Sequence, residues 1–343
     1  MFLDYYNIGG IEKVINDLKL NLNNYQIDIL TFVNKSNNKT IVSLLKKNYR
    51  NFFLRNILSL NKLKKYLKNN NYDIIHIHCY NAFGLIYARI ASKYIKKVII
   101  HAHNTNIDND KFKIKLLINN LIKKIYKNNN YIYIAPTINC SKFCFNKKSL
   151  IIPNSIDYNK YYQNNKDRIK YRNLFNIDKK DIVIGHIGRF ESQKNHEFII
   201  DIFNDINKLK NNYKLILIGE GNLLNKIKDK VNNLNLNNKV IFLNNRLDIP
   251  NLINMFDIYL FPSLYEGFPI SVIEQQVNNK DVYVSDKLDK SITISNKIHF
   301  ISLNKTSLEW AKIIINNKNN KLILNNKLDI HNYVKKIEEI YKK

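Results

Sequence analysis

The sequence has only three cysteines in 343 residues, Cys79, Cys140 and Cys144. Three thiols do not make a disulfide framework, and this low number is typical of a protein from a reducing cytoplasm. Cys140 and Cys144 also lie near no pair of histidines at the spacing of a zinc site. The cysteine content therefore argues against a disulfide-stapled secreted domain and against a metal site at these thiols.

Long apolar runs are missing as well. No uncharged stretch approaches the ~20 residues that a membrane-spanning helix needs, and the first seven residues do not have the pattern of a secretory signal peptide. We therefore expect a cytoplasmic protein that is soluble or binds a membrane at its surface, on the inner face of the plasma membrane.

Acidic residues are scarce, since 28 Asp and Glu stand against 55 Lys and Arg, which gives a net charge of +27. The excess is concentrated in residues 1–160, with 26 basic and 8 acidic side chains. Such a field favours anionic partners, namely nucleic acid, an anionic membrane or a phosphorylated substrate. A lysine bias of the whole chain explains the excess equally well, so charge alone does not choose among these partners.

Glycine and proline are few, with 8 and 5 residues, and short apolar runs alternate with longer amphipathic segments. This alternation predicts an α/β protein with parallel, doubly wound sheets. It pauses at residues 156–176, where we place the hinge between two Rossmann-like domains that face a cleft. The predicted domains are residues 1–160 and 161–325, and residues 326–343 form a final helix that packs back toward the N-terminal domain.

The first strand is predicted to be unusually short. Gly9 and Gly10 form a turn into a helix, and only the segment Phe2–Tyr6 precedes them. Either this strand is very short or the chain is truncated at its start. The glycines offer backbone amides at the beginning of a helix, where phosphate groups bind readily.

Two stretches combine Leu, Ile and Phe with many lysines: Leu44–Leu67 and Lys111–Lys127. Basic amphipathic helices of this kind can lie on anionic leaflets. Ordinary surface helices in a lysine-rich protein would have the same pattern. The sequence leaves these two interpretations open.

Two carboxylates follow the apolar strand Ile258–Phe261. Glu266 lies in the loop after the strand, and Glu274 lies on the helix that Pro269 opens. In open α/β sheets this end of a strand is where ligands bind. A helix-borne carboxylate can accept two hydrogen bonds from a ribose diol, and a loop carboxylate can meet sugar hydroxyls. The alternative is two solvated glutamates.

Three further groups of residues are candidates for anion binding. The backbone amides of Gly267 and Phe268 lie near the predicted helix start. After the strand Ile182–Ile187, Gly188 relieves a turn, and Arg189 and Lys194 follow around the same loop. Both cations could converge on a diphosphate and stabilise the charge of a leaving group. Two ordinary surface cations are the alternative.

Histidines end two apolar strands. His101 and His103 point to one face by strand alternation, and His103 is nearer the carboxyl end. His76 and His78 follow the same pattern. A histidine at a strand end is more often structural than functional.

These motifs occur together and in order, and the chain resembles the retaining glycosyltransferases of family 4, which have the GT-B fold, in the branch of bacterial capsule and exopolysaccharide biosynthesis. The motifs that carry the resemblance span nearly the whole chain: Gly9–Glu12, Asp73–His78, His101–Asn104, Asn139–Ser141, Pro153–Asp157, Gly185–His196, Gly219–Gly221 and Phe261–Gln276.

The resemblance implies a role for each matching residue. Arg189 and Lys194 would clamp the diphosphate, and Glu274 would bind the ribose. Glu266 would lie at the donor sugar, and His103 beside the transferred sugar. The remaining binding residues implied by the resemblance are Gly10 and Gly188 near the phosphates, Arg246 near the base, and Gly267, Phe268 and Pro269 at the donor.

The implied reaction moves a sugar with retention from a nucleotide diphosphate sugar to a saccharide that is linked to a polyprenol. Neither a metal nor a further cofactor is expected, since Arg189, Lys194 and backbone amides supply the charge, and no specific nucleic acid is expected as a partner. Asp108–Asp110 resembles the metal motif of the other large glycosyltransferase fold, but no further metal ligand accompanies it. Two alternatives stay open, a GT-B-like protein without activity and a basic protein that binds nucleic acid or membranes.

Overall fold

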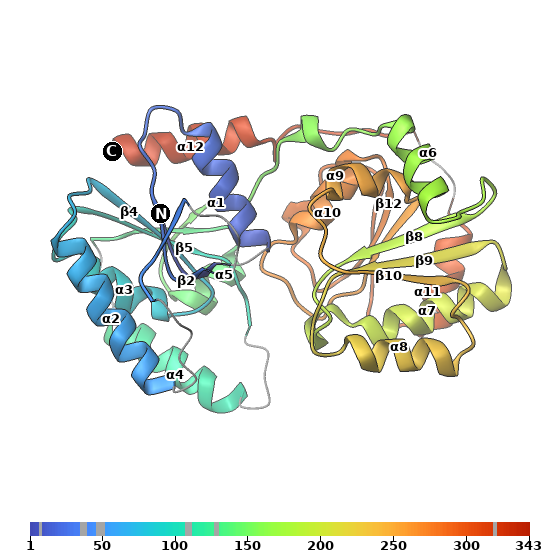
Figure 1. The fold of residues 1–343 in the computed structure, drawn as a ribbon, viewed down its shortest axis with the longest axis horizontal. Coiled ribbons are helices and arrows are strands. Elements are labelled where there is room, and N and C mark those ends of the chain that lie inside the picture. Colours follow the sequence, from blue (N-terminus) through green and yellow to red (C-terminus); the bar gives the residue numbers. More distant parts are fainter. Residues whose placement is uncertain (7–8, 35–39, 46–51, 107–111, 127–129, 318–320) are drawn as a thin grey trace. The chain divides into compact units, whose positions relative to one another are not determined.

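The computed structural model describes residues 1–6, 9–34, 40–45, 52–106, 112–126, 130–317 and 321–343. The chain forms two units, each built on a parallel sheet (Figure 1). Unit 1 contains residues 1–155 and 330–343, and unit 2 contains residues 156–329. The sequence prediction placed these boundaries a few residues away, at 160 and 325. Asp108–Asp110 lies outside the described residues.

Unit 1 is built on a sheet with seven strands among the described residues, in the order β3-β2-β1-β4-β5-β6-β7. All neighbouring strands are parallel. The order reverses between β1 and β4, so that successive strands are added outward in both directions. The strands are β1 (Phe2–Tyr6), β2 (Ile29–Asn34), β3 (Ile41–Ser43), β4 (Ile74–Cys79), β5 (Lys97–Ala102), β6 (Ile132–Ala135) and β7 (Leu150–Ile151).

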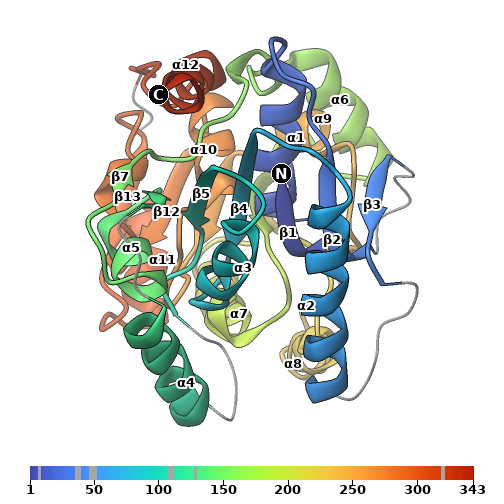
Figure 2. The same ribbon diagram turned by 90° about the vertical axis from the view of Figure 1, so that its left-hand side faces the viewer.

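Helices cover both faces of this sheet (Figures 1 and 2). On one face, α1 (Gly10–Asn21) contacts α12 (Ile330–Lys342), the last helix of the chain. The other face carries α2 (Phe52–Lys68), α3 (Phe83–Ala91), α4 (Phe112–Ile125) and α5 (Ile138–Cys144). Figure 2 shows α3 between α2 and α4, in agreement with its contacts to both.

Unit 2 has six strands among its described residues, in the order β10-β9-β8-β11-β12-β13. They are again parallel, and the order reverses between β8 and β11. These strands are β8 (Ile182–Ile187), β9 (Tyr213–Ile218), β10 (Val240–Leu243), β11 (Ile258–Phe261), β12 (Asp281–Ser285) and β13 (Ile298–Ile301). The two sheets confirm the predicted pair of doubly wound α/β domains.

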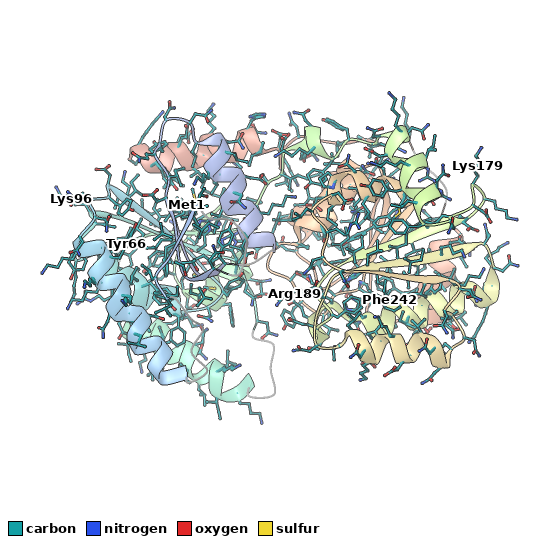
Figure 3. All side chains as sticks on the ribbon, viewed as in Figure 1. Met1, Tyr66, Lys96, Lys179, Arg189 and Phe242 are labelled. Carbon is teal, nitrogen blue, oxygen red and sulfur yellow. The ribbon has the colours of Figure 1, made fainter. Side chains whose placement is uncertain are left out.

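The helices of unit 2 also lie on both faces of the sheet (Figure 1). One face carries α7 (His196–Leu209), α8 (Leu224–Asn233) and α11 (Ser307–Ile315), which enclose an apolar core with the sheet. The other carries α9 (Ile249–Leu252) and α10 (Ile270–Val277). Side chains fill the space between each sheet and its helices (Figure 3). Among the described residues, no helix is long and apolar enough to cross a bilayer.

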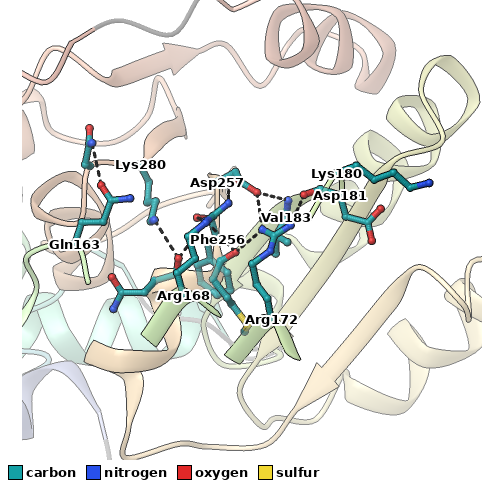
Figure 4. Close-up of polar contacts among 12 residues, drawn as sticks. Gln163, Arg168, Arg172, Lys180, Asp181, Val183, Phe256, Asp257 and Lys280 are labelled. Carbon is teal, nitrogen blue, oxygen red and sulfur yellow. Dashed lines mark hydrogen bonds and ion pairs between the residues drawn. The ribbon is translucent and has the colours of Figure 1, made fainter. Parts of the chain in front are cut away.

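The predicted pause at residues 156–176 is wrong in part, because α6 (Asn165–Leu174) forms there. This helix has little apolar periodicity, and two arginine side chains attach it to the rest of unit 2 (Figure 4). Arg168 donates to Asp257 at 2.6 Å and to the Phe256 carbonyl at 3.0 Å. Arg172 donates to Asp257 at 3.2 Å. The sequence prediction relied on the spacing of apolar residues. It missed this helix because arginine contacts, and not an apolar face, attach the helix to the unit.

The short first strand is present in the structure. β1 pairs with β2 over four residue pairs and with β4 over two. Phe2 and Leu3 are fully buried, and Phe2 makes edge-to-face contacts with Phe32 and Tyr87. Five residues are enough here because the strand lies in the interior of the sheet, where both neighbours supply backbone hydrogen bonds.

Candidate functional site

The candidate site of unit 2 lies where the strand order of its sheet reverses. β8 and β11 pair through Ile184 with Ile258 and through Gly185 with Tyr259. Loops leave the carboxyl ends of these two strands toward α7 and α10. In open α/β sheets, the reversal point leaves room between such loops for a ligand. The predicted residues of Gly188–Lys194 and Glu266–Pro269 all belong to these two loops.

The two loops are hydrogen bonded to each other. The Gln193 side chain donates to the Tyr265 carbonyl at 2.9 Å, and the Leu264 amide donates to the Gln193 carbonyl at 2.9 Å. The Asn195 side chain donates to the Pro262 carbonyl at 3.1 Å. Sequence reasoning did not single out Gln193 or Asn195. Such bonds hold the loops in one arrangement, which a preorganised polar site requires.

Lys194 and Glu266 form an ion pair across the two loops. The Lys194 Nζ lies 2.6 Å from the Glu266 Oε1, and the two side chains are only 15% and 8% exposed. The Nζ also lies over the ring of Phe261, 4.7 Å from its centroid. A partly buried ammonium held by a carboxylate and an aromatic face keeps a fixed position. The structure thus brings together two of the four predicted catalytic residues.

Arg189 and Arg246 make ion pairs of their own. Arg189 lies 2.9 Å from Glu191, and its side chain is 65% exposed. Arg246 donates to Asp248 through two nitrogens, at 2.8 and 2.6 Å. These hydrogen bonds from Arg246 are the main reason why the pKa of Asp248 falls to about 2. The pair therefore stays charged over the whole physiological pH range.

Glu274 lies on α10 and is almost completely buried. The helix begins at Ile270 after Pro269, which has an extended backbone and provides no side-chain cap. Gly267, Phe268 and Pro269 precede the helix and are buried. The amides at this helix start can meet a ligand oxygen, since no side chain of the N-cap residue binds them. The helix therefore offers both a carboxylate and backbone donors.

Glycines allow the loop after β8 to approach its neighbours closely. Gly219 has a φ of +147°, and a Cβ there would lie 2.2 Å from the Gly188 carbonyl oxygen. Gly221 has a φ of +156°, and a Cβ there would lie 2.5 Å from the Phe190 carbonyl oxygen. The Gly219–Gly221 turn therefore supports the loop that carries Arg189 and Lys194. Its two glycines serve packing.

Unit 1 presents its candidate residues at its own reversal point, between β1 and β4. Gly9 is the N-cap of α1, and Gly10 is the first residue of that helix. Both glycines are exposed. A Cβ on Gly9 would lie 2.7 Å from the carboxylate of Glu12, which belongs to the first turn of α1 and is buried. The start of α1 thus already carries one carboxylate, and a phosphate bound there would lie beside this negative charge.

Four buried histidines form a stack: His76 and His78 on β4, His101 on β5, and His103 directly after β5. The rings of His76 and His78 are 4.3 Å apart, as are those of His101 and His103. His78 Nδ1 lies 3.0 Å from His103 Nε2, and His76 Nε2 lies 3.3 Å from His101 Nδ1. The stack confirms that these side chains share one face of the sheet.

Burial keeps this stack neutral. Desolvation lowers the pKa of all four rings well below the ordinary value of 6.5, to about 3 for His101. At the far end of the stack, His76 Nδ1 lies 2.8 Å from the hydroxyl of Tyr341 on α12. A chain of contacts therefore runs from His103 through His78 and His76 to the C-terminal helix.

Three of the stacked histidines bring ring nitrogens close to one another. One nitrogen from each of His76, His78 and His101 lies within 4.8 Å of the others. The rings are close to parallel, with interplanar angles of 11–30°. His76 Nε2 and His101 Nδ1 lie 3.3 Å apart and are turned toward one another. The contacts fit hydrogen bonding and ring stacking between neutral imidazoles.

Comparison with protein families gives two matches that follow each other along the chain. Residues 8–160 match the model "Glycosyltransferase Family 4", and residues 167–288 match the model "Glycosyl transferases group 1". The first match lies mainly in unit 1 and the second lies in unit 2, and together they include the candidate residues of both units.

Curated relatives are similar over most of their length. An Escherichia coli UDP-Gal:alpha-D-GlcNAc-diphosphoundecaprenol alpha-1,3-galactosyltransferase is 26% identical and is aligned over 97% of this chain and 94% of its own length. The capsular polysaccharide biosynthesis glycosyltransferase CapH of Staphylococcus aureus is 27% identical, over 82% of this chain and 79% of its own.

Solved structures agree on the fold. HepE of Anabaena, in a complex with UDP and glucose, superposes with a TM-score of 0.80 over 100% of this chain and 98% of its own, at 18% identity. WaaG, a glycosyltransferase of lipopolysaccharide biosynthesis, gives a TM-score of 0.72 over 91% of this chain and 88% of its own, at 15% identity. The two sheets and these neighbours define the chain as a GT-B protein. With the family matches, it belongs to the family 4 glycosyltransferases.

Proposed function

We propose that this glycosyltransferase moves a sugar, with retention of anomeric configuration, from a nucleotide diphosphate sugar to a polyprenol-linked saccharide during surface polysaccharide biosynthesis. The observation that carries the proposal is the Lys194–Glu266 pair between two hydrogen-bonded loops at the reversal point of the unit 2 sheet. The GT-B fold and the names of the relatives support the reaction class. The E. coli relative is named for a diphosphoundecaprenol-linked substrate.

Charge placement supports transfer without a metal ion. As the bond between sugar and diphosphate breaks, negative charge grows on the leaving group, and a fixed cation there lowers the barrier. An ammonium has three N–H donors, so its bond to Glu266 does not prevent Lys194 from donating to a phosphate oxygen. Arg189 would be the second cation, because its exposed guanidinium can leave Glu191 for a diphosphate at modest cost.

The roles of the remaining candidate residues follow from the resemblance to family 4 glycosyltransferases and from the chemistry of each side chain. We assign the ribose hydroxyls to the helix-borne carboxylate of Glu274, and the donor sugar to Glu266 together with the amides of Gly267 and Phe268. We assign contact with the transferred sugar to His103. A neutral imidazole fits that role, since the low pKa of the His103 ring keeps it uncharged at neutral pH.

A screen of nucleotide sugars tests the reaction. The purified chain is incubated with each nucleotide diphosphate sugar and a polyprenol diphosphate saccharide, and release of nucleoside diphosphate is measured. We expect turnover with one donor or a few, and nuclear magnetic resonance of the product should show the anomeric configuration of the donor. An inverted product would contradict retention.

A binding measurement tests the site independently of the acceptor. Glu274→Ala should weaken binding of the nucleoside diphosphate by about 10- to 100-fold, because one charge-assisted hydrogen bond contributes ~1.5–3 kcal/mol. Asp229→Ala, which removes an exposed carboxylate from α8, should leave binding unchanged. Turnover with no donor, together with equal binding by Glu274→Ala and the parent chain, would refute the proposal.

A further inference from the structure

Helix α4 exposes an unusual number of large apolar side chains. Ile114, Leu117, Ile118, Leu121 and Ile125 are 60%, 69%, 43%, 56% and 62% exposed. Their spacing of three and four residues places them on one face of the helix. A continuous outward stripe of five branched aliphatic residues differs from the single exposed Leu or Ile that any surface carries.

The helix is attached to unit 1 by its opposite side. Asn119 is buried, accepts from the Ala82 amide at 2.8 Å and donates to the Phe143 carbonyl at 3.0 Å. Ile122 is buried in the core of the unit, and Lys123 donates to the Lys142 carbonyl at 3.3 Å. These contacts fix the rotation of α4, so that the aliphatic stripe faces away from the sheet.

Helix α2 shows the arrangement expected of an ordinary surface helix. In its described side chains, Leu63 and Leu67 are buried, and Lys62, Lys64, Lys65 and Lys68 point outward. Both helices have the same mixture of Leu, Ile and Lys. The structure distinguishes them, because α2 turns Leu63 and Leu67 inward among its described side chains, whereas α4 turns many of its apolar residues outward.

The charged residues of α4 itself are all cationic. Helix α4 contains no Asp or Glu, and the exposed Lys113 and Lys124 lie beside the aliphatic residues on the helix surface. Nearby apolar and cationic groups match the interfacial region of an anionic bilayer, where acyl chains accept the stripe and phosphate headgroups accept the lysines.

We propose that the outward face of α4, formed by Ile114, Leu117, Ile118, Leu121 and Ile125 with Lys113 and Lys124, docks the protein on an anionic bilayer. A second copy of the chain fits the surface poorly, because a symmetric contact between two α4 helices would place the lysines of one copy against those of the other. This surface adds a membrane contact to the proposed function and does not depend on the donor chemistry.

Vesicle flotation with the full chain tests the surface. We expect the protein to float with vesicles of phosphatidylcholine and phosphatidylglycerol, and much less with phosphatidylcholine alone. Leu117→Asn with Leu121→Asn should reduce the bound fraction on anionic vesicles about tenfold. Both residues are exposed, so the melting temperature should stay unchanged. Lys113→Glu with Lys124→Glu should also reduce binding.

Helix α2 provides the matched control. Lys62→Glu with Lys65→Glu changes the net charge by the same amount on the same unit, and it should lower binding clearly less than the α4 charge reversal. Equal effects would mean that only the overall positive charge matters, and this result would overturn the proposal. Concentration-dependent dimers that Leu117→Asn with Leu121→Asn abolishes, without loss of vesicle binding, would assign the surface to a second copy instead.

A spectroscopic readout reports insertion directly. The chain has one tryptophan, Trp310, and it is fully buried in unit 2. A Leu117→Trp variant should therefore add an exposed indole whose emission shifts to shorter wavelength on anionic vesicles; an unshifted spectrum on vesicles that bind the protein would contradict insertion of α4. Release of nucleoside diphosphate with a water-soluble acceptor should be unaffected by the α4 variants, so failure of membrane docking is distinguishable from failure of the proposed reaction.

Discussion

The two units have the same arrangement of strands and helices, but their titratable candidate residues differ: those of unit 2 are charged, and those of unit 1 are neutral histidines. In unit 2, charged side chains on loops form an ion pair, and side chains and backbone join the two loops. In unit 1, neutral histidines on the strands themselves form a buried stack. The same fold can therefore hold a fixed charge for an anionic ligand in one unit and an uncharged polar surface in the other.

The largest effect should come from the charge in unit 2. Lys194→Ala should lower kcat/KM about 10²–10³-fold, as expected when one preorganised charge at a developing anion is lost. Lys208→Ala removes an exposed lysine that pairs with Asp205 on α7 and should have no effect. Initial rates of nucleoside diphosphate release measure both.

A double-mutant cycle shows whether Lys194 and Glu266 act as one unit. The variant with Lys194→Ala and Glu266→Gln should lose less activity than the two single losses multiplied together, because the two groups share one interaction besides their separate contacts with the donor. Fully additive losses would mean that the ion pair has no role in placing the lysine, and the two residues would then act separately.

The second effect concerns stability. Gly219→Ala should lower the free energy of unfolding by about 3 kcal/mol, because its φ of +147° and the 2.2 Å approach to the Gly188 carbonyl combine strain with overpacking. Gly9→Ala in unit 1 is the control, since there the close atom is the end of a flexible glutamate. Chemical denaturation followed by Trp310 fluorescence measures unit 2, and circular dichroism measures both units; equal stabilities of the two variants would contradict the packing argument.

The next largest effect should be a difference between the two units in their loss of stability at low pH. Each buried neutral histidine has a lower pKa in the folded state, so the unfolded chain binds a proton that the folded chain does not. Stability is therefore complete above pH 6.5 and falls toward the folded pKa, about 3 for His101 and His196. The loss is ~1.4 kcal/mol per pH unit for each histidine.

Unit 1 contains four such histidines, and unit 2 contains two, His186 and His196. Unit 1 should therefore lose protection first as the pH falls below 6.5. Hydrogen exchange with mass spectrometry follows the two units separately. If unit 2 opened first, the histidine stack would not be the dominant acid-sensitive feature.

The smallest effect should come from within the histidine stack. His78→Ala should lower kcat about fivefold with KM unchanged, since the loss of one hydrogen bond to His103 costs ~1 kcal/mol. His78→Asn should restore most of the rate, because its amide can take the place of the imidazole Nδ1. A lower rate in both variants, with a lower melting temperature, would indicate a structural role alone.

Much of the fold could be predicted from local patterns. Ile182–Ile187 and Ile258–Phe261 were predicted with the bounds that the structure has. Such strands are buried on both faces, so they read as continuous apolar runs between turn residues. β3 and α5 were missed because three and seven residues are too short for a periodic signal.

The sequence predicted the residues of the candidate site but not the contacts among them. Residue types and their place after strands indicated Lys194, Glu266 and Glu274, but their partners could not be read. The loop contacts of Gln193 and Asn195 join segments about 70 residues apart, and such pairings depend on which strands become neighbours. Arg246 likewise pairs with Asp248, and the hydroxyl of Tyr171 donates to the same carboxylate. No rule of sequence spacing suggested either contact.

The sequence by itself determined the alternation of strands and helices, the excess of positive charge and the chemical groups at the strand ends, because these depend on local order along the chain. Only the tertiary structure decided which groups meet. It paired Lys194 with Glu266, stacked the four histidines, and turned the aliphatic stripe of α4 outward while α2 turned Leu63 and Leu67 inward. A helical period shows that a helix has two faces, but the contacts of Asn119 and Ile122 with the rest of unit 1 decide which face remains exposed.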